Sequence, residues 1–99
     1  MDTATSPLNS TSFDAFARDA REAGYDEVLQ RDWQPNTVVA QHSHPFDAHA
    51  VLIQGEMWLT CDGVARHITA GGSFTLPKGT PHAERYGSEG ASYWVARRT

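Results

Sequence analysis

The regular spacing of turn residues after residue 26 constrains the fold of this chain most strongly. Short apolar or alternating runs are separated by segments rich in Pro, Gly, Asn and Asp, at residues 33–36, 44–47, 62–63, 71–72, 77–79 and 87–90. A separation of roughly 8 to 12 residues between turns is typical of a sandwich or barrel of antiparallel strands. Asp62-Gly63 predicts a tight hairpin between strands at 57–61 and 64–68, because both central positions of such a turn need positive φ. We therefore predict an all-β domain.

One helix is expected before the strands. The apolar residues there follow the spacing of one helix face: Phe13, Phe16, Ala17, Ala20 and Ala23. Thr11 with Asp14 resembles a capping box, and Gly24 is a suitable end for the helix. We predict a short N-terminal amphipathic helix that covers one side or the mouth of the β-domain. The polar residues 1–11 are expected to form a flexible tail, which leaves residues 12–99 as a single domain.

Length and charge exclude several classes of function. A chain of 99 residues has room for one core, and its net charge of −4 argues against nucleic acid or an anionic membrane as a partner. The only basic cluster, at residues 96–99, is expected to be solvated. We see neither an apolar run long enough to cross a bilayer nor an export signal. The single cysteine, Cys61, cannot form an internal disulfide, and we expect a cytoplasmic protein.

Four of the five histidines fall in two short segments. His42 and His44 lie two residues apart, His49 begins the apolar run at 50–53, and His82 follows a Pro-x-Gly turn. Residues two apart on an extended strand point to the same side, so His42 and His44 can aim at one point. Four imidazoles delivered by separate strands could surround one metal ion. His67 stands alone in its segment and is expected to have a surface or structural role.

Strand alternation predicts which neighbours share a face with each histidine. If the histidines point inward, Val38 and Ala40 accompany His42, and Val51 and Ile53 accompany His49. In the same way, Glu84 and Tyr86 accompany His82. This arrangement is consistent with a metal at one end of an apolar cavity. The aromatic side chains at Trp58 and Trp94 are the ones we would test for contact with a ligand.

These segments resemble the two motifs of the cupin family. The first motif reads Gly-x5-His-x-His-x3,4-Glu-x6-Gly, and His42-x-His44-x4-His49-x5-Gly55 follows it with two departures. Asn36 replaces the leading glycine, and His49 stands where the family usually has glutamate. The second motif reads Gly-x5-Pro-x-Gly-x2-His-x3-Asn, and Gly71-x5-Pro77-x-Gly79-x2-His82 matches it up to the last position, which is Tyr86. The resemblance covers residues 36–98.

The resemblance implies a double-sheet jelly-roll β-barrel with a metal site. His42, His44 and His82 take the three histidine-ligand positions, and with His49 they imply a four-histidine site. His49 could also turn away and leave three histidines. Such a site favours a divalent metal that suits imidazole, namely iron, zinc, copper or nickel. Glu84 and Tyr86 are candidate catalytic residues, as general base and acid beside the metal, or else are simply salt-bridged or packed strand residues.

Two functions remain open at this point. In one, the chain is a metal-dependent enzyme of dioxygenase or lyase/isomerase type acting on a small organic molecule, since cupins with histidine-only sites include both. In the other, it is a non-catalytic sensor or carrier, or its metal is purely structural. We favour the enzyme slightly. We also expect a homodimer, because small cupins usually pair and a short barrel leaves sheet edges to cover.

Overall fold

The computed structural model describes residues 12–99 and shows one helix followed by six strands within that range. The predicted tail, residues 1–11, lies outside the described residues. The elements are α1 (Phe13–Glu22), β1 (Glu27–Trp33), β2 (Val38–His42), β3 (Asp47–Cys61), β4 (Val64–Thr69), β5 (Ser73–Leu76) and β6 (His82–Arg98). The only helix in this range, α1, has ten residues and is far too short to cross a membrane.

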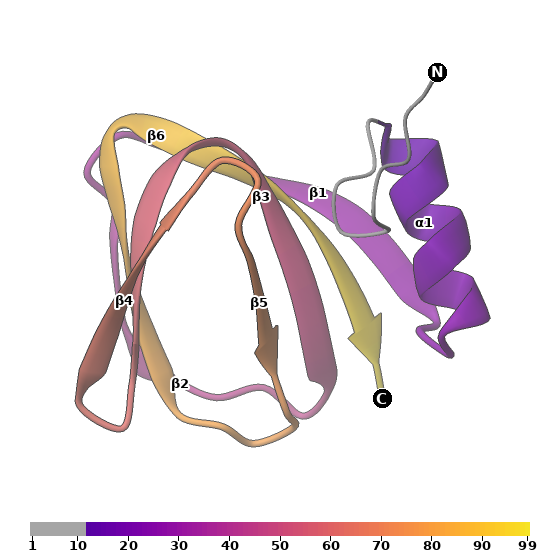
Figure 1. Cartoon of the computed structure of the whole chain (residues 1–99). Helices are drawn as coiled ribbons and strands as arrows, with labels where there is room; N and C mark the ends of the chain where they lie inside the picture. Colours follow the sequence, from indigo (N-terminus) through magenta and orange to yellow (C-terminus); the bar gives the residue numbers. More distant parts are fainter. Residues whose placement is uncertain (1–11) are drawn as a thin grey trace.

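The strands form a jelly roll built on two long bent strands, β3 and β6 (Figure 1). The first half of β3 and the second half of β6 pair with each other and are flanked by β5 and β1. The second half of β3 and the first half of β6 are flanked by β4 and β2. All these pairs are antiparallel. Two four-stranded sheets that share β3 and β6 therefore face each other, which confirms the predicted double-sheet barrel.

The bend between the two sheets corrects one sequence-based expectation. The segment at residues 87–90 is not a turn between strands, because β6 runs through it without a break. The pairing of β3 with β6 shifts register on both sides of Gly55. Gly55 has φ of 82°, and a Cβ there would lie 2.1 Å from the carbonyl oxygen of Gly90. Gly55 is thus needed for close backbone approach at the bend, where a side chain would not fit.

The Asp62-Gly63 hairpin is present as predicted. Asp62 and Gly63 have φ of 52° and 76°, and they join β3 to β4. Asn36, at the position where the family motif has glycine, has φ of 60°. Asparagine enters this left-handed region more readily than other residues with a side chain. Asparagine at residue 36 can therefore hold a left-handed conformation at the position where the motif has glycine.

Helix α1 packs on the outside of the barrel. Its N-cap is Ser12, whose Oγ accepts a hydrogen bond from the backbone N–H of Ala15. Thr11 of the predicted capping box lies outside the described residues. Gly24 follows the helix with φ of 99°, as expected for a helix end. Phe16 and Ala20 pack against a cluster on the outer face of the first sheet, made by Val51, Trp94 and Ala96. The helix therefore covers one side of the barrel (Figure 1).

A second and larger cluster fills the barrel interior. It contains alternate residues of β3, among them Ala50 and Leu52, together with residues of the other strands such as Met57 and Tyr86. All four of these side chains are completely buried. The first half of β3 is consequently apolar on both faces, with the barrel core on one side and α1 on the other.

Candidate metal centre

A bulge in β2 aims His42 into the barrel. Val39 pairs with Glu84 and His42 pairs with His82, so β2 has one more residue than β6 between these two pairs. The extra residue places Val39, which packs on the interior core, on the same side as His42. Val38 is 70% exposed, so the expectation that Val38 and Ala40 share the inner face with His42 is wrong. His44 follows in the loop after β2.

Direct hydrogen bonds join the two histidine-bearing segments. The backbone N–H of Gly79 donates to the carbonyl oxygen of His44 at 2.9 Å. The Asp47 carboxylate accepts from the backbone N–H of Lys78 at 2.7 Å and from the Arg98 guanidinium at 3.2 Å. The Lys78 bond and then Arg98 lower the pKa of Asp47, so its carboxylate stays charged. The Pro-x-Gly turn is thereby fixed against the loop that carries His44.

Three histidines converge in the barrel. The nitrogen atoms available as ligands on His42, His44 and His82 all lie within 4.8 Å of one another. Nδ1 of His42 is 2.8 Å from the carbonyl oxygen of Ala40, and Nδ1 of His82 is 2.9 Å from that of Thr80. A carbonyl can only accept, so both Nδ1 atoms carry a proton, and in the neutral rings both Nε2 atoms present a lone pair. Fixing the tautomer in this way is typical of metal-binding histidines.

Burial lowers the pKa of His44, and the nearby His42 and His82 lower it further. The His44 ring stacks on Phe46, with ring centroids 4.8 Å apart. His44 is therefore held in place and kept in the neutral form that a metal requires.

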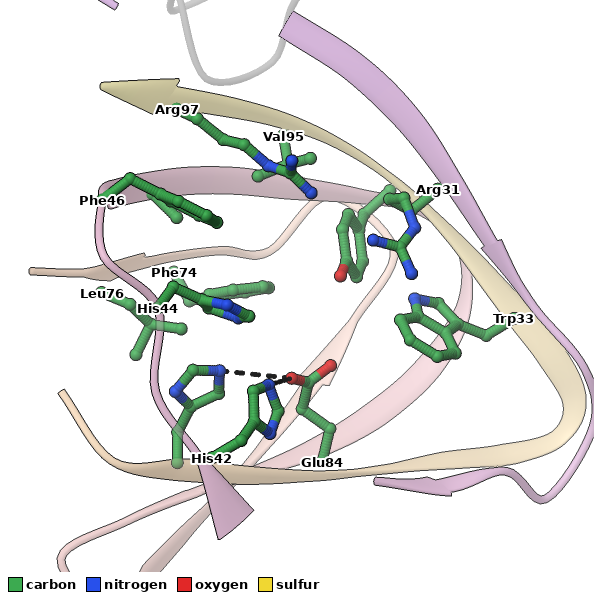
Figure 2. A pocket seen from close by; sticks show the side chains of 13 residues that line it. Arg31, Trp33, His42, His44, Phe46, Phe74, Leu76, Glu84, Val95 and Arg97 are labelled. Atoms are coloured by element: carbon green, nitrogen blue, oxygen red, sulfur yellow. Dashed lines mark ion pairs between the residues drawn. The ribbon is translucent and has the colours of Figure 1, made fainter. Parts of the chain in front are cut away.

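The carboxylate of Glu84 faces the same point. Its Oε2 lies 3.3 Å from Nε2 of His82 and 3.6 Å from Nε2 of His42 (Figure 2). Its Oε1 accepts a hydrogen bond from the hydroxyl of Tyr86. Burial raises the pKa of Tyr86, so this hydroxyl remains a donor. Trp33 stacks on Tyr86 with ring centroids 4.8 Å apart, which fixes the phenol. The expected sharing of one face by His82, Glu84 and Tyr86 is confirmed.

His49 is not part of this group, which corrects the expected four-histidine site. It lies on the outer face of β3 with Val51 and Ile53, and its Nδ1 is hydrogen-bonded to Thr75 Oγ1 at 2.9 Å. Its ring stacks on Phe16 of α1, with centroids 6.3 Å apart. Burial beneath the helix lowers the pKa of His49. The residues predicted to share a face with His49 do so, but that face is the outer one.

The three histidines and Glu84 line a cavity of about 140 Å³ in the barrel. Phe46, Phe74, Leu76 and Val95 supply apolar walls, and Arg31, Trp33 and Arg97 lie on the side away from the histidines (Figure 2). Tyr93 also lines the cavity. A cavity of similar size engineered into another protein holds benzene. The site can therefore accept a small organic molecule beside the histidines.

Several side chains differ from their expected positions. Trp94 lies beneath α1, and Trp58 stacks with His67 on the surface, so neither lines the cavity. Nε2 of His67 is hydrogen-bonded to Oε1 of Glu56 at 2.7 Å, in keeping with the expected surface or structural role. Arg97, in the terminal segment expected to be solvated, faces the cavity instead. Arg31 and Arg97 stand outside the histidine motifs, and no sequence pattern marked them.

Comparison with known proteins agrees with this geometry. Residues 30–96 match the family described as "Cupin domain". No curated protein matches the sequence.

Solved structures share the fold at low sequence identity. An RmlC-like cupin from Shewanella frigidimarina is 21% identical with a TM-score of 0.64, over 73% of this chain and 65% of that one. The cupin domain of Cnp3 from Schizosaccharomyces pombe is 14% identical with a TM-score of 0.67, over 73% and 51%. Oxalate decarboxylase from Bacillus subtilis, a protein with Mn(II) centres, is 20% identical with a TM-score of 0.67, over 78% and 22%. The chain thus spans less than two thirds of each of these proteins.

Proposed function

The chain belongs to the cupin family, and we propose that it binds a divalent transition metal and a small organic molecule side by side within the barrel. The observation that carries this proposal is the convergence of histidine nitrogens and a carboxylate at one point of the cavity (Figure 2). Nε2 of His42, Nε2 of His82 and Oε2 of Glu84 face one another at 3.3 and 3.6 Å, and His44 completes the group. Acceptors that face each other repel unless a cation lies between them. Protonation of an imidazole would satisfy the contact of that one ring with Glu84, whereas a single metal ion satisfies all of these contacts at once.

The residues present fit such an ion. Three neutral imidazoles and one carboxylate form a donor set common in metalloproteins, and we propose Glu84 as the fourth ligand in place of His49. Tyr86 orients Glu84 through the hydrogen bond to Oε1, as a partner of a metal-ligating carboxylate would. The donor set suits iron, zinc, copper or nickel. Its carboxylate oxygen also admits manganese, which the expected all-imidazole site disfavoured.

We propose an enzymatic role of dioxygenase or lyase/isomerase type. When bound, the metal would polarise an oxygen atom of the ligand as a Lewis acid. Glu84 faces both the ligand nitrogens and the cavity, so in a site where the three histidines alone hold the metal it is instead the proposed general base for a bound molecule. Tyr86 is fully buried and does not line the cavity, so we assign it a positioning role in place of the predicted acid.

A non-catalytic sensor or carrier is the second candidate. The solved structures that share the fold range from an enzyme to a domain of a larger protein, so the fold leaves both roles open. An exchangeable water on the metal favours catalysis, and a closed tetrahedral site favours a structural metal.

Metal stoichiometry tests the proposed site. Protein purified without a metal-affinity tag should contain about one transition-metal ion per chain by elemental analysis. His44→Ala should lose it, and His49→Ala should keep it, because His49 lies on the other face of β3. Glu84→Gln should retain the metal with weaker affinity. A protein that neither carries nor takes up metal would contradict the proposal.

We also propose that the chain forms a homodimer. Strands at the sheet edges keep unpaired backbone groups that a second copy can cover. Two valines on the edge strands β2 and β4, Val38 and Val64, are 70% and 66% exposed, and a second copy would cover such apolar side chains. Light scattering after size exclusion should give twice the chain mass, and a monomer mass would exclude the dimer.

A further inference from the structure

We infer that Arg31 and Arg97 form an anion site in the cavity and that the natural ligand is a small organic acid. Its carboxylate lies against the two guanidinium groups, and a second oxygen, as in a hydroxy or keto acid, faces the histidines. The second half of this inference rests on the proposed metal site. The arginine site stands on its own contacts.

The two arginines reach the cavity from neighbouring strands and are held by aromatic rings. Arg31 comes from β1 and Arg97 from β6, and Figure 2 shows both guanidinium groups directed into the cavity. The guanidinium carbon of Arg31 lies 4.8 Å from the ring centre of Trp33, and that of Arg97 lies 4.8 Å from the ring centre of Phe46. Stacking of this kind fixes the plane of a guanidinium group and leaves its N–H groups free to bind a carboxylate.

The arginines are incompletely paired by the protein. Arg97 meets Glu27 at 3.4 Å, but Glu27 is 59% exposed, and solvent weakens such a pair. Within residues 12–99, Arg31 has no ion-pair partner among the acidic side chains. Neither guanidinium is therefore neutralised by a buried carboxylate.

Two buried donors on this side of the cavity lack good acceptors. Nε of Arg97 is inaccessible to solvent and has no acceptor, and Nε1 of Trp33 is buried against the Tyr93 hydroxyl without a hydrogen bond of good geometry. Burial raises the pKa of Tyr93, so its hydroxyl keeps its proton. Buried N–H groups without good acceptors leave this side of the cavity electropositive, which favours a ligand with negative charge. A carboxylate offers about four lone-pair positions to the remaining N–H groups of the two guanidinium groups that line the cavity.

Charge and size narrow the ligand class. The cavity is lined by two guanidinium groups but by one carboxylate, Glu84, which is engaged by the histidines and Tyr86. A divalent metal would add further positive charge, so an anion is needed for balance. The volume of about 140 Å³ fits a ligand about the size of benzene. The apolar walls at Phe74 and Leu76 suit a short hydrocarbon body.

Pyruvate and its neutral amide, pyruvamide, form a matched pair of probes. Calorimetry on the zinc-loaded protein should show pyruvate binding at least about tenfold more tightly, since charge-assisted bonds to arginine are lost in the amide. Arg31→Gln and Arg97→Gln should each weaken pyruvate binding about tenfold to a hundredfold. Arg31→Lys keeps the positive charge but loses the planar guanidinium fork. Its affinity for pyruvate should therefore lie between those of the wild type and Arg31→Gln. Arg85→Gln is the control, because Arg85 lies on β6 but stacks on Trp58 outside the cavity.

The same titration by NMR in EDTA separates this inference from the metal proposal. Metal-free protein should still prefer pyruvate, with weaker affinity but the same dependence on Arg31 and Arg97. Equal affinity for the two probes, or an equal loss in Arg85→Gln, would overturn the anion site even if zinc binds. Arginine-dependent pyruvate binding in a protein that takes up no metal would support the anion site and contradict the metal centre alone.

Discussion

Both faces of the first half of β3 are apolar, but the histidines on the two sides of this strand have different neighbours. On the inner face, Ala48 and Leu52 belong to the barrel core, and Ala48 lines the cavity that holds three histidines. On the outer face, His49 and Val51 lie beneath α1. The inner histidines meet one another and a carboxylate, whereas His49 meets a phenylalanine and a threonine. A histidine in the right motif position therefore becomes a ligand only if its strand turns it toward the others.

The largest expected contrast between these faces is in stability. Leu52→Ala should lower the free energy of unfolding by about 2–5 kcal/mol, because Leu52 is completely buried in the barrel core. Ile53→Ala removes the same number of carbon atoms from the next residue, which is only partly buried on the outer face. Its cost should fall below about 2 kcal/mol, since less apolar surface is lost. Urea denaturation measures both, and equal losses would show that the faces are equally packed.

An intermediate effect is expected from removing a single hydroxyl. Tyr86→Phe deletes the hydrogen bond to Glu84 and should weaken metal binding about tenfold to a hundredfold, as loss of such a partner typically does. Tyr25→Phe makes the same change beside His49 on the outer face and should leave metal affinity unaltered. Competition with a zinc-binding dye gives both affinities. Unchanged affinity in Tyr86→Phe would mean that Tyr86 does not orient a ligand.

The smallest expected effect is a pH dependence that comes from His49. Burial lowers its pKa in the folded protein, so the unfolded chain binds more protons as the pH falls below the ordinary value of about 6.5. The contribution of His49 to the free energy of unfolding is fully present above its ordinary pKa of about 6.5 and is lost as the pH falls toward the lowered pKa. His49→Gln should therefore show a flatter stability profile between about pH 7 and pH 5 in chemical denaturation. Parallel profiles for the two proteins would exclude His49 as the source.

The sequence predicted the barrel and three of the site's histidines because both depend on local rules. Turn residues such as Asp62 and Gly63 mark strand ends through their own backbone preferences, whatever the rest of the chain does. His42, His44 and His82 lie at or beside a strand end, where the Pro-x-Gly turn docks on the loop of His44. The inward direction of the Glu84 side chain was predicted correctly because Glu84 lies two residues after His82 on an unbroken stretch of β6.

The face of His49 could not be read from the sequence because both faces of that strand segment are apolar. The alternating sets Ala48-Ala50-Leu52 and His49-Val51-Ile53 look equally suited to a core, and α1 covers the second. Strand alternation identifies a buried face only when the other face is polar. Arg31 and Arg97 were missed for another reason. Their role depends on contacts between β1, β6 and the cavity that no local pattern records.

Anomalous X-ray scattering from zinc-loaded crystals tests the central claim most directly. We expect one strong peak at the zinc edge inside the barrel, about 2.0–2.1 Å from Nε2 of His42 and His82 and from a ring nitrogen of His44, with Glu84 as the nearest carboxylate. His49 should remain hydrogen-bonded to Thr75 beneath α1. A peak at His49 or at the surface pair His67 and Glu56, with none among the three inner histidines, would contradict the account.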